Sequence, residues 1–511
     1  MERFIIKHQD KITGIISCFD RIMFKGYLPV SSPEGMEGFL NRHGILFKDF
    51  KRFASTCSEG LKIYAQDVAR SANRPFQYIY SSIRKEECAR EIALRDGITQ
   101  GLVCVFSIVE ACHSFKLKYG AGKPRLAASR PRCLCLYYYY MDKEFGLMHV
   151  RLQTWFPFTI QIYINGHEWL SRKMMRHGIA YTQVENAFIQ IEDCKRAQRF
   201  ADKFVRTNFP RILEAIARKI NPLFNDLLKD MHYYWVIDQA EYATDILFKD
   251  RASLKCLYEK LLRHATVCFS AEDVMTFLGR KLNGNFQGEV ANELKKRWPG
   301  ARVKHRMKGN WIKMYDKHGC VLRIETVINH PYEFRVRREG KRRGLWTMAW
   351  YPMAKRVSNL YRYAEVCYSA NHAYIEALSV IDDPAKTYRT LHQLCVPVTR
   401  NGRQIRGLNP MRKDDLQLFS AALRGENFIH GFRNNDIARY LNLPARQDPV
   451  ERKRQSARVT RLIHLLHAHG LIAKIPRTRR YRLTLRGATF MAAAVYLYNE
   501  DFPNMVFNNA A

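Results

Sequence analysis

The stretch CLCLYYYYMDKEFGLMHVRLQTWFPFTIQIYINGHEWL, residues 133–170, predicts the core of the fold. Three runs rich in aromatic and branched residues are separated by short turns, at 133–142, 146–155 and 158–164. The last run ends at Asn165-Gly166, a pair that favours a tight turn. A helical run follows and ends at Gly178. We therefore expect an antiparallel sheet with a helix packed against it, an α+β arrangement.

The flanking sequence extends this pattern in both directions. The segment ITGIISCFDRIMFKGYL, from Ile12 to Leu28, is β-rich but interrupted by Asp20 and Arg21, which favours a hairpin or a strand edge. The run 101–115 predicts one or two buried strands after a mostly helical region. Residues 182–280 are expected to be helical, including YYWVIDQAEYATDILF at 233–248. A second antiparallel β region is expected at about 300–338.

The length of 511 residues predicts several domains, because one core rarely organises more than about 100–200 residues. We divide the chain into an α+β domain with a Gly/Pro/Arg-rich loop, a mainly helical region, a basic sheet with a helix, and a C-terminal helix-turn-helix domain with a wing. The boundaries are 1–180 with the loop at 116–132, 181–295, 296–405 and 406–511.

Charge is the strongest compositional signal. The chain has 84 Lys and Arg against 48 Asp and Glu, a net charge of +36 and a pI near 9.8. A field of one sign this large attracts a polyanion. Nucleic acid is therefore the expected partner, DNA before RNA, while the sequence leaves the oligomeric state open.

The sequence predicts no membrane association and a cytoplasmic location. No window of about 18 apolar residues occurs, and the charged start MERFIIKHQDK does not resemble a signal peptide. The 13 cysteines lack CxxC pairs, and the closest two, Cys133 and Cys135, fall on a predicted strand. We expect buried reduced thiols, with neither a disulfide framework nor the ligand spacing of a structural zinc site.

The tail RLIHLLHAHGLIAKIPRTRRYRLTLRG, residues 461–487, predicts a helix, a glycine stop and a short hairpin with a basic turn. Two helical segments precede it, and a further helix begins near Leu485. This order resembles the winged-helix domains of MarR-type regulators over roughly 415–500. The histidine pair His467 and His469 is not expected to bind metal, because residues two apart on a helix point in different directions.

The resemblance implies that the long helix enters the DNA major groove and that the wing contacts the backbone. Between Arg446 and Arg486 the chain has twelve Lys or Arg and two acids. The predicted DNA-binding residues are Arg452, Lys453, Arg454, Arg458, Arg461, Arg477, Arg479 and Arg480. The alternatives are a solvated charged face on a protein-binding domain, and RNA binding.

The whole chain also resembles an uncharacterised family of bacterial proteins. The matching stretches are GIISCFDRIMFKGYLP, RLQTWFPFTIQIYINGHEWL and YDKHGCVLRIETVIN. The resemblance implies no activity, but it suggests that body and tail belong to one unit. A body of about 400 residues departs from a simple MarR-type repressor.

The body has a second basic region, with thirteen Lys or Arg and four acids from Arg302 to Arg343. Aromatic residues alternate with these charges, as on surfaces that hold single strands or RNA. The alternative is that the rings on one sheet face form a core. Candidate nucleic-acid contacts in the body are Lys304, Lys308, Trp311, Lys313, Arg335, Arg337, Arg342 and Arg343, with Lys123 and Arg125 in the 116–132 loop.

A phosphodiester-cleaving site would require two to four converging carboxylates that bind divalent metal, with Mg²⁺ as the expected cofactor. The candidates are Asp20, Glu110, Asp245, Asp316 and Glu325. Glu325 is the most suggestive, because it is an acid inside a basic sheet, and Asp20, Asp245 and Glu325 are the predicted catalytic set. Taken singly, each acid is better explained as an ion pair with one of the many arginines. Tyr315, between Lys313 and Lys317, is an alternative nucleophile.

Two function classes follow. We expect a non-catalytic nucleic-acid-binding protein that uses its C-terminal winged helix for DNA and its body for RNA or single strands. The alternative is a nuclease, transposase or replication protein of the mobile-element type. Convergence of Asp20, Asp245 and Glu325 in the structure would favour the enzyme.

Overall fold

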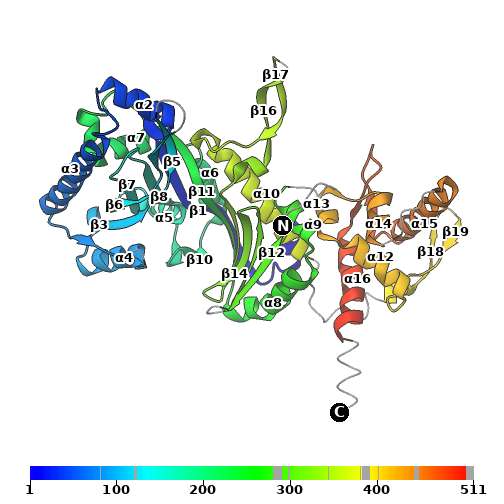
Figure 1. Ribbon diagram of the computed structural model, residues 1–511. Helices are drawn as coiled ribbons and strands as arrows, with labels where there is room; N and C mark the ends of the chain where they lie inside the picture. The colour runs from blue at the N-terminus through cyan, green and yellow to red at the C-terminus, as the bar shows by residue number, and fades with distance from the viewer. Residues whose placement is uncertain are drawn as a thin grey trace, which may run out of the picture. The chain divides into compact units, whose positions relative to one another are not determined.

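The computed structural model describes residues 1–80, 82–119, 124–279, 290–296, 300–342, 344–379, 381, 392–400, 402–441, 443 and 448–501. The chain forms two compact units, and Figure 1 labels many of the helices and strands of which they consist. Unit 1 consists of Met1–Thr13, Ile246–Ile324 and Ser369–Ala511, and unit 2 of Gly14–Asp245 and Glu325–Tyr368. The fold is mixed α/β, as the sequence predicts in outline.

Unit 2 is built on a mixed sheet. The strands follow the order β15-β11-β1-β8-β7-β6-β3-β2, and the pair β2–β3 is parallel whereas β3–β6, β6–β7, β7–β8 and β1–β8 are antiparallel. Their bounds are β1 (Ile12–Tyr27), β2 (Phe76–Tyr78), β3 (Gly101–Ala111), β6 (Arg132–Asp142), β7 (Gly146–Gln153), β8 (Ile160–Asn165), β11 (Tyr234–Phe248) and β15 (Val321–Ile328).

The described residues of unit 2 also form helices and three hairpins. The helices are α2 (Pro33–Arg42), α3 (Phe50–Ser71), α4 (Lys85–Arg95), α5 (Gly166–Arg176), α6 (Cys194–Phe204) and α7 (Phe209–Ile220). Short 3-10 turns lie at η1 (Pro29–Ser31), η2 (Pro222–Asn225), η4 (Pro331–Glu333) and η5 (Val357–Asn359). The hairpins pair β4 (Ser114–Lys118) with β5 (Arg125–Ser129), β9 (Tyr181–Val184) with β10 (Ala187–Ile191), and β16 (Arg335–Arg342) with β17 (Leu345–Pro352).

The three strands predicted from residues 133–164 are confirmed as β6, β7 and β8. Val150 on β7 lies between Tyr138 on β6 and Ile162 on β8, and all three side chains are buried. α5 follows and ends before Gly178, whose φ of +66° suits glycine. Asn165 does not make the predicted tight turn: its side chain accepts a hydrogen bond from the Glu168 backbone and caps α5.

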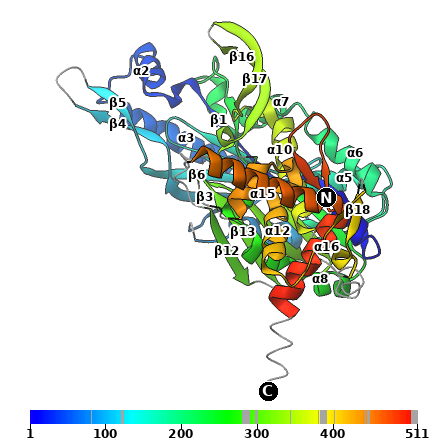
Figure 2. The ribbon, with the colours of Figure 1, turned by 90° about the vertical axis from the view of Figure 1, so that its right-hand side faces the viewer.

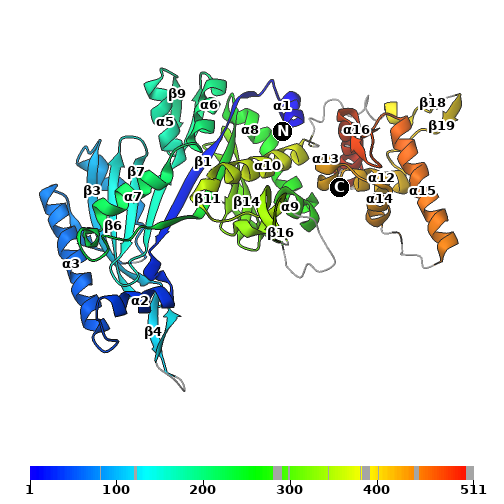
Figure 3. The ribbon, with the colours of Figure 1, turned by 90° about the horizontal axis from the view of Figure 1, so that it is seen from above.

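The prediction of a hairpin or strand edge at Asp20 is wrong. β1 is one strand of 16 residues that runs through Asp20 and Arg21 without a turn (Figure 3). It lies between β11 and β8, so it is a central strand. Asp20 is only 2% exposed, so the polar residue that interrupts the apolar pattern is a carboxylate buried within the strand. A polar residue that breaks an apolar pattern is expected at functional sites.

The prediction of a helix over 233–248 is also wrong, because this segment forms the strand β11. The rest of the predicted helical region contains α6, α7, α8 (Arg251–Arg263) and α9 (Ala271–Phe277), besides the β9–β10 hairpin. Most side chains of β11 are buried on both faces, so apolar residues do not alternate cleanly with polar ones. Without that alternation, a buried strand and a buried helix cannot be distinguished by periodicity.

The β4–β5 and β16–β17 hairpins extend from the rest of unit 2 (Figure 2). The first includes part of the predicted basic loop, and its Arg125 is exposed. Lys123 and Arg343 lie outside the described residues. The second hairpin follows β15 in the chain. β15 is the neighbour of β11 in the sheet, so the predicted second β region does not form an independent sheet.

Unit 1 begins with α1 (Glu2–Lys7) and contains the strand order β12-β13-β14. Its other elements before the C-terminal region are α8, η3 (His264–Cys268), α9 and most of α10 (Leu360–Leu378), with strands β12 (Ala291–Lys296), β13 (Ala301–Met307) and β14 (Asn310–Lys317). Aromatic packing holds it together: Tyr374 of α10 packs edge-on against Phe269 and Phe277 and hydrogen-bonds His305.

The C-terminal region of unit 1 has its own apolar core, contributed by helices and a short hairpin. The elements are β18 (Val398–Arg400), β19 (Arg403–Ile405), α12 (Lys413–Ala422), α13 (Gly425–His430), α14 (Asn434–Tyr440), α15 (Pro449–Ala468), β20 (Ile472–Lys474), β21 (Tyr481–Leu483), α16 (Leu485–Tyr496) and η7 (Leu497–Asp501). Gly470 follows α15 with φ +68°, at the predicted helix stop. Gly487 lies so close to the Leu471 carbonyl that a Cβ would clash.

Candidate functional site

Three neighbouring strands of unit 2 bring three carboxylates together. Asp20 comes from β1, Glu241 from β11 and Glu325 from β15, and β11 lies between the other two strands. One oxygen of each carboxylate lies within 4.8 Å of those of the other two. Asp20 and Glu325 are 2% and 1% exposed, whereas Glu241 is half-buried. We call these three residues the carboxylate cluster.

The cluster depends on strand geometry. Successive side chains of a strand point to opposite faces, so Glu241 and Asp245 share one face of β11 with Ala243 between them. Because β1 and β15 flank β11, one acid from each strand can meet at the same height of the sheet. Strand pairing therefore gathers residues that are far apart in the sequence.

His167 links the carboxylate cluster to Asp245. Its Nδ1 lies 3.3 Å from Asp20 Oδ1 and its Nε2 lies 3.6 Å from Asp245 Oδ2, so the imidazole stands between two carboxylates. Both contacts become ion pairs when the imidazole is protonated. His167 is fully buried and Asp245 is 1% exposed. The imidazole enters the site at the first turn of α5, directly after the Asn165 cap.

Asn186 orients Asp20 from another side. Its Nδ2 donates to Oδ1 and Oδ2 of Asp20 at 3.1 and 3.2 Å. Asn186 lies between β9 and β10, directly after Glu185, whose positive φ of 52° belongs to the same turn. The small hairpin thus holds the carboxylate of Asp20 in a fixed position.

Positive charge also lies beside the cluster. Although desolvation lowers the pKa of Arg21, the nearby Tyr163, Asp20 and Glu241 raise it, and the net pKa lies above its usual value. Tyr163, together with Asp20 and Glu241 of the cluster, therefore stabilises the Arg21 cation. The same field would attract a divalent cation, because it favours positive charge.

The donor set suits a hard divalent cation. Mg²⁺ prefers carboxylate oxygens at about 2.0–2.1 Å, so oxygens on opposite sides of one ion stand about 4.2 Å apart. Carboxylate oxygens within 4.8 Å of one another can therefore surround a single ion after small movements. All three members of the cluster are carboxylates. Thiol or imidazole ligands would instead favour softer metals.

The structure brings together two of the predicted catalytic residues, Asp20 and Glu325. Asp245 is joined to them through His167 and is not one of the three clustered carboxylates. Tyr315 belongs to unit 1, where it is 6% exposed on β14. Asp316 accepts a hydrogen bond from the Gly319 backbone at the end of β14, which is a structural role.

Sequence reasoning missed Glu241, His167 and Asn186. The signal for Glu241 was its spacing from Asp245, since residues four apart share a face of a strand, but the segment had been assigned to a helix. His167 and Asn186 have no comparable local signal. Glu110, the other considered acid, lies in ion pairs with Arg151 and Lys85.

The predicted DNA-binding residues of the long helix lie on its exposed surface. These are Arg452, Lys453, Arg454, Arg458 and Arg461 of α15. Arg477 and Arg479 are exposed in the turn between β20 and β21. Arg480 is half-buried and donates a hydrogen bond to the Gly431 carbonyl at 3.1 Å, so it also ties the hairpin to the domain.

The predicted contacts of the body fall in two places. In unit 1, the Lys304 ammonium lies 4.4 Å from the Trp311 ring, on the face that also carries Lys313, and Lys308 is exposed in the turn. In unit 2, Arg335 and Arg337 are exposed on β16. Arg342 ends that strand. Their role in binding stays a prediction.

Comparison with protein-family models, curated proteins and solved structures finds no match for this chain. Among the described residues, no helix is both long and apolar enough to span a bilayer.

Proposed function

We propose that this protein cleaves or transfers phosphodiester bonds of a nucleic acid with divalent metal bound at the carboxylate cluster. The convergence of Asp20, Glu241 and Glu325 carries the proposal. It is the reason for preferring an enzyme to the non-catalytic binder that the sequence favoured.

Gathering three acids in one buried place opposes stability. Like charges at such separations repel strongly where water is scarce. Arg21 lies beside the cluster, and the three carboxylates nevertheless also lie against each other. Such an arrangement is typical of sites that bind cations, where function outweighs the cost to stability.

A divalent ion there would stabilise the charge that develops on the phosphate and would help to activate the attacking group. The protein residues would hold the ion and prevent the carboxylates from rotating. Asn186 and His167 both contact Asp20, and Asp245 fixes the other side of the imidazole. Ligands oriented by such outer contacts bind metal more tightly, typically by 10–100-fold.

We propose that residues 406–511 contain a winged-helix domain that docks the enzyme on duplex DNA. The succession α14, α15, β20, β21 and α16 supports this assignment, as do the exposed arginines of α15 and of the β20–β21 turn. In such domains the second helix of the motif enters the major groove and basic residues contact phosphates.

The β16–β17 hairpin is a second proposed contact, suited to unstacked bases. Trp346, Met348 and Trp350 alternate along β17 and are 68%, 55% and 63% exposed. Arg337 pairs in register with Trp350, so charge and ring lie side by side. Rings bind bases by stacking while cations bind the backbone.

The first experiment is a cleavage assay with the full chain. Labelled single-stranded DNA, duplex DNA and RNA are incubated with Mg²⁺ or Mn²⁺, or with chelator. We expect cleavage that needs metal and that is lost in Asp20→Asn and Glu325→Gln. Asp238→Asn is the matched control, because Asp238 lies on β11 but on the face opposite Glu241.

Metal binding is measured separately by thermal unfolding. A ligand that binds only the folded state raises its stability by about 2.7 kcal/mol at 100 times Kd. We expect Mn²⁺ to raise the Tm of the wild-type chain and of Asp238→Asn, but not of Glu325→Gln. No cleavage and equal metal shifts in all three proteins would overturn the proposal. Nucleic-acid binding that persists in that case would restore the non-catalytic binder.

A further inference from the structure

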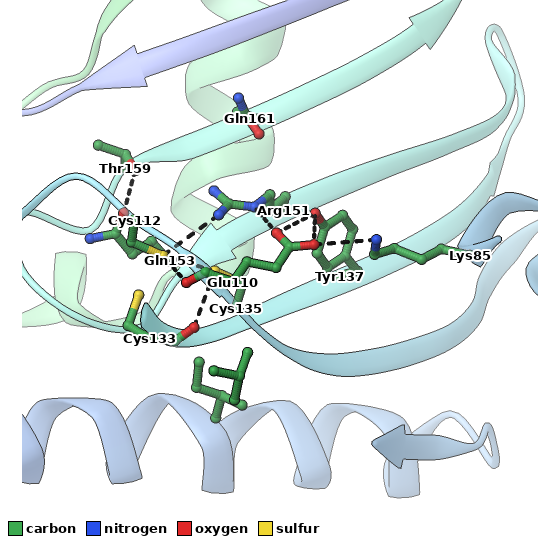
Figure 4. Close-up of polar contacts among 12 residues, drawn as sticks. Lys85, Glu110, Cys112, Cys133, Cys135, Tyr137, Arg151, Gln153, Thr159 and Gln161 are labelled. Carbon is green, nitrogen blue, oxygen red and sulfur yellow. Dashed lines mark hydrogen bonds and ion pairs between the residues drawn. The ribbon is translucent and has the colours of Figure 1, made fainter. Parts of the chain in front are cut away.

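A second cluster of metal-binding side chains lies elsewhere in unit 2. Cys112 directly follows β3, and Cys133 and Cys135 lie on the neighbouring strand β6 (Figure 4). The three sulfur atoms all lie within 4.8 Å of one another, and those of Cys112 and Cys135 are 3.4 Å apart. We call these three residues the thiol cluster.

Strand register explains how the thiol cluster forms. Cys133 and Cys135 are two residues apart on a strand, so their side chains point to the same face. They pair with Glu110 and Ile108 of β3, and the Cys112 backbone donates to the Pro131 carbonyl just before β6. This fold brings the third thiol next to the pair, although the sequence contains no CxxC motif.

The position of Cys112 is fixed by a buried amide. Gln153 is completely buried, and its Nε2 donates to the carbonyls of His113 and Trp155, each at 2.8 Å. Its Oε1 in turn accepts a hydrogen bond from Thr159 at 2.8 Å. The residue after Cys112 is thereby tied to the turn between β7 and β8. The cluster is therefore held in place before any ligand binds.

The surrounding charges favour an anionic ligand set. Arg151 donates to Cys112 Sγ at 3.7 Å and to Glu110 at 3.0 Å, and Lys85 lies 3.2 Å from Glu110. Arg151 and Lys85 are cations and Glu110 is an anion, so these three groups together place one net positive charge beside the sulfur atoms. Three thiolates around Zn²⁺ carry one negative charge, whereas three around Cu(I) carry two.

We infer that Cys112, Cys133 and Cys135 form a three-thiolate site for a d10 cation, with Zn²⁺ favoured over Cu(I) by the charge balance. Sulfur ligands at about 2.3 Å from one ion stand roughly 3.8–4.0 Å apart, which the observed separations allow after small shifts. Half-buried Cys133 gives the ion its entry path, since Cys112 and Cys135 are 3% and 0% exposed.

This inference goes beyond the expectation of ordinary buried thiols at these positions, and it does not depend on the carboxylate cluster. Soft thiolates and hard carboxylates select different cations. Zinc could therefore be retained in a protein that needs Mg²⁺ for cleavage, and either proposal could fail without the other.

The test is elemental analysis of the full chain purified under reducing conditions, followed by Co²⁺ replacement and absorption spectroscopy. We expect about one equivalent of zinc and, with Co²⁺, a thiolate-to-metal charge-transfer band. Cys133→Ser should lower the retained zinc about tenfold or more. Cys88→Ser is the matched control, because Cys88 is also half-buried but lies on α4 outside the cluster.

A measurement on the wild-type chain covers the case in which Cys133→Ser does not fold. Added Zn²⁺ should protect the half-buried Cys133 from alkylation in the folded chain, while the exposed Cys256 and Cys395 still react. Copper instead of zinc in the purified protein would support the site and change the ion. The inference would be overturned if the Co²⁺ charge-transfer band and the protection from alkylation did not depend on these three thiols. A disulfide between Cys112 and Cys135 in the isolated protein would also overturn it.

Discussion

The carboxylate cluster of unit 2 and the basic helix α15 of unit 1 gather charge in opposite ways. The cluster draws one acid from each of three strands and buries two of them almost completely. α15 presents five basic residues from a single helix to solvent. Exposed like charges repel weakly in water, whereas buried ones repel strongly. The carboxylate cluster therefore forms only in the complete fold, whereas the basic surface of α15 follows from the sequence of one helix.

This difference leads to opposite expectations for neutralising substitutions. Removing a charge from the carboxylate cluster should relieve repulsion while it removes a metal ligand. Removing charges from α15 should leave folding and chemistry unchanged while it weakens attraction to a polyanion.

The largest effect is expected for Glu325→Gln. Loss of one of three metal-binding carboxylates should reduce cleavage on the order of 10³-fold or more, because bound metal contributes several kcal/mol to catalysis. The free energy of unfolding without metal should stay equal or rise, as expected when a strained site is relaxed. Cleavage rates and urea unfolding measure the two effects. If Glu325→Gln were inactive because it is unfolded, the expectation that this substitution removes activity without reducing stability would be wrong.

The double substitution Arg458→Ala plus Arg461→Ala should weaken duplex DNA binding by a few kcal/mol, through lost groove and phosphate contacts. The slope of log affinity against log salt should fall by about two. The rate at saturating substrate and the Tm should not change. Titrations at several salt concentrations provide the measurement. Unchanged affinity would exclude α15 as the DNA reader.

A smaller effect is expected for Trp346→Ala on the β16–β17 hairpin. Loss of one stacking ring should weaken single-strand binding by about 1–3 kcal/mol. Thr347→Ala is the control, since Thr347 is also exposed but points to the other face of β17. Fluorescence anisotropy with a labelled oligonucleotide separates the two variants. Equal losses would show that the hairpin does not bind through its rings.

The last effect is a graded loss of stability in acid, which should affect both units. Burial lowers the pKa of His149 in unit 2 to about 3 and that of His305 in unit 1 to about 4, from 6.5. The unfolded chain therefore binds more protons below pH 6.5. Stability should fall as the pH drops from about 6.5 towards 4, by up to about 1.4 kcal/mol per pH unit for each histidine.

Substitution His149→Phe isolates the contribution of unit 2. The ring of His149 stacks on Tyr163 at an interplanar angle of 10°, and phenylalanine can retain that stacking. Urea unfolding at pH 7, 6 and 5 should show a shallower loss of stability in the variant. An unchanged slope would mean that the neutral imidazole is not the group that titrates.

Local sequence was sufficient for elements whose pattern repeats over a short range. The strands β6, β7 and β8, the helix α5 with its glycine stop, and the helix α15 with its basic surface were predicted correctly. It failed at β1 and β11, where Asp20 and buried faces disturb the usual alternation. Those two strands carry acids of the candidate site. The buried acids that form the site are also the residues that disturb the sequence pattern, which is why the secondary-structure prediction failed there.

The sequence by itself determined the net charge, the exposed arginines of α15 and the two acids Asp20 and Glu325 as candidates. Only the tertiary structure decided that Glu241 joins them, that His167 connects Asp245, and that Cys112 meets Cys133 and Cys135. The physical reason is that the two-residue period of a strand fixes the face on which a side chain lies, but not which strand becomes its neighbour. Strand order is decided by packing between distant segments, and both clusters depend on it.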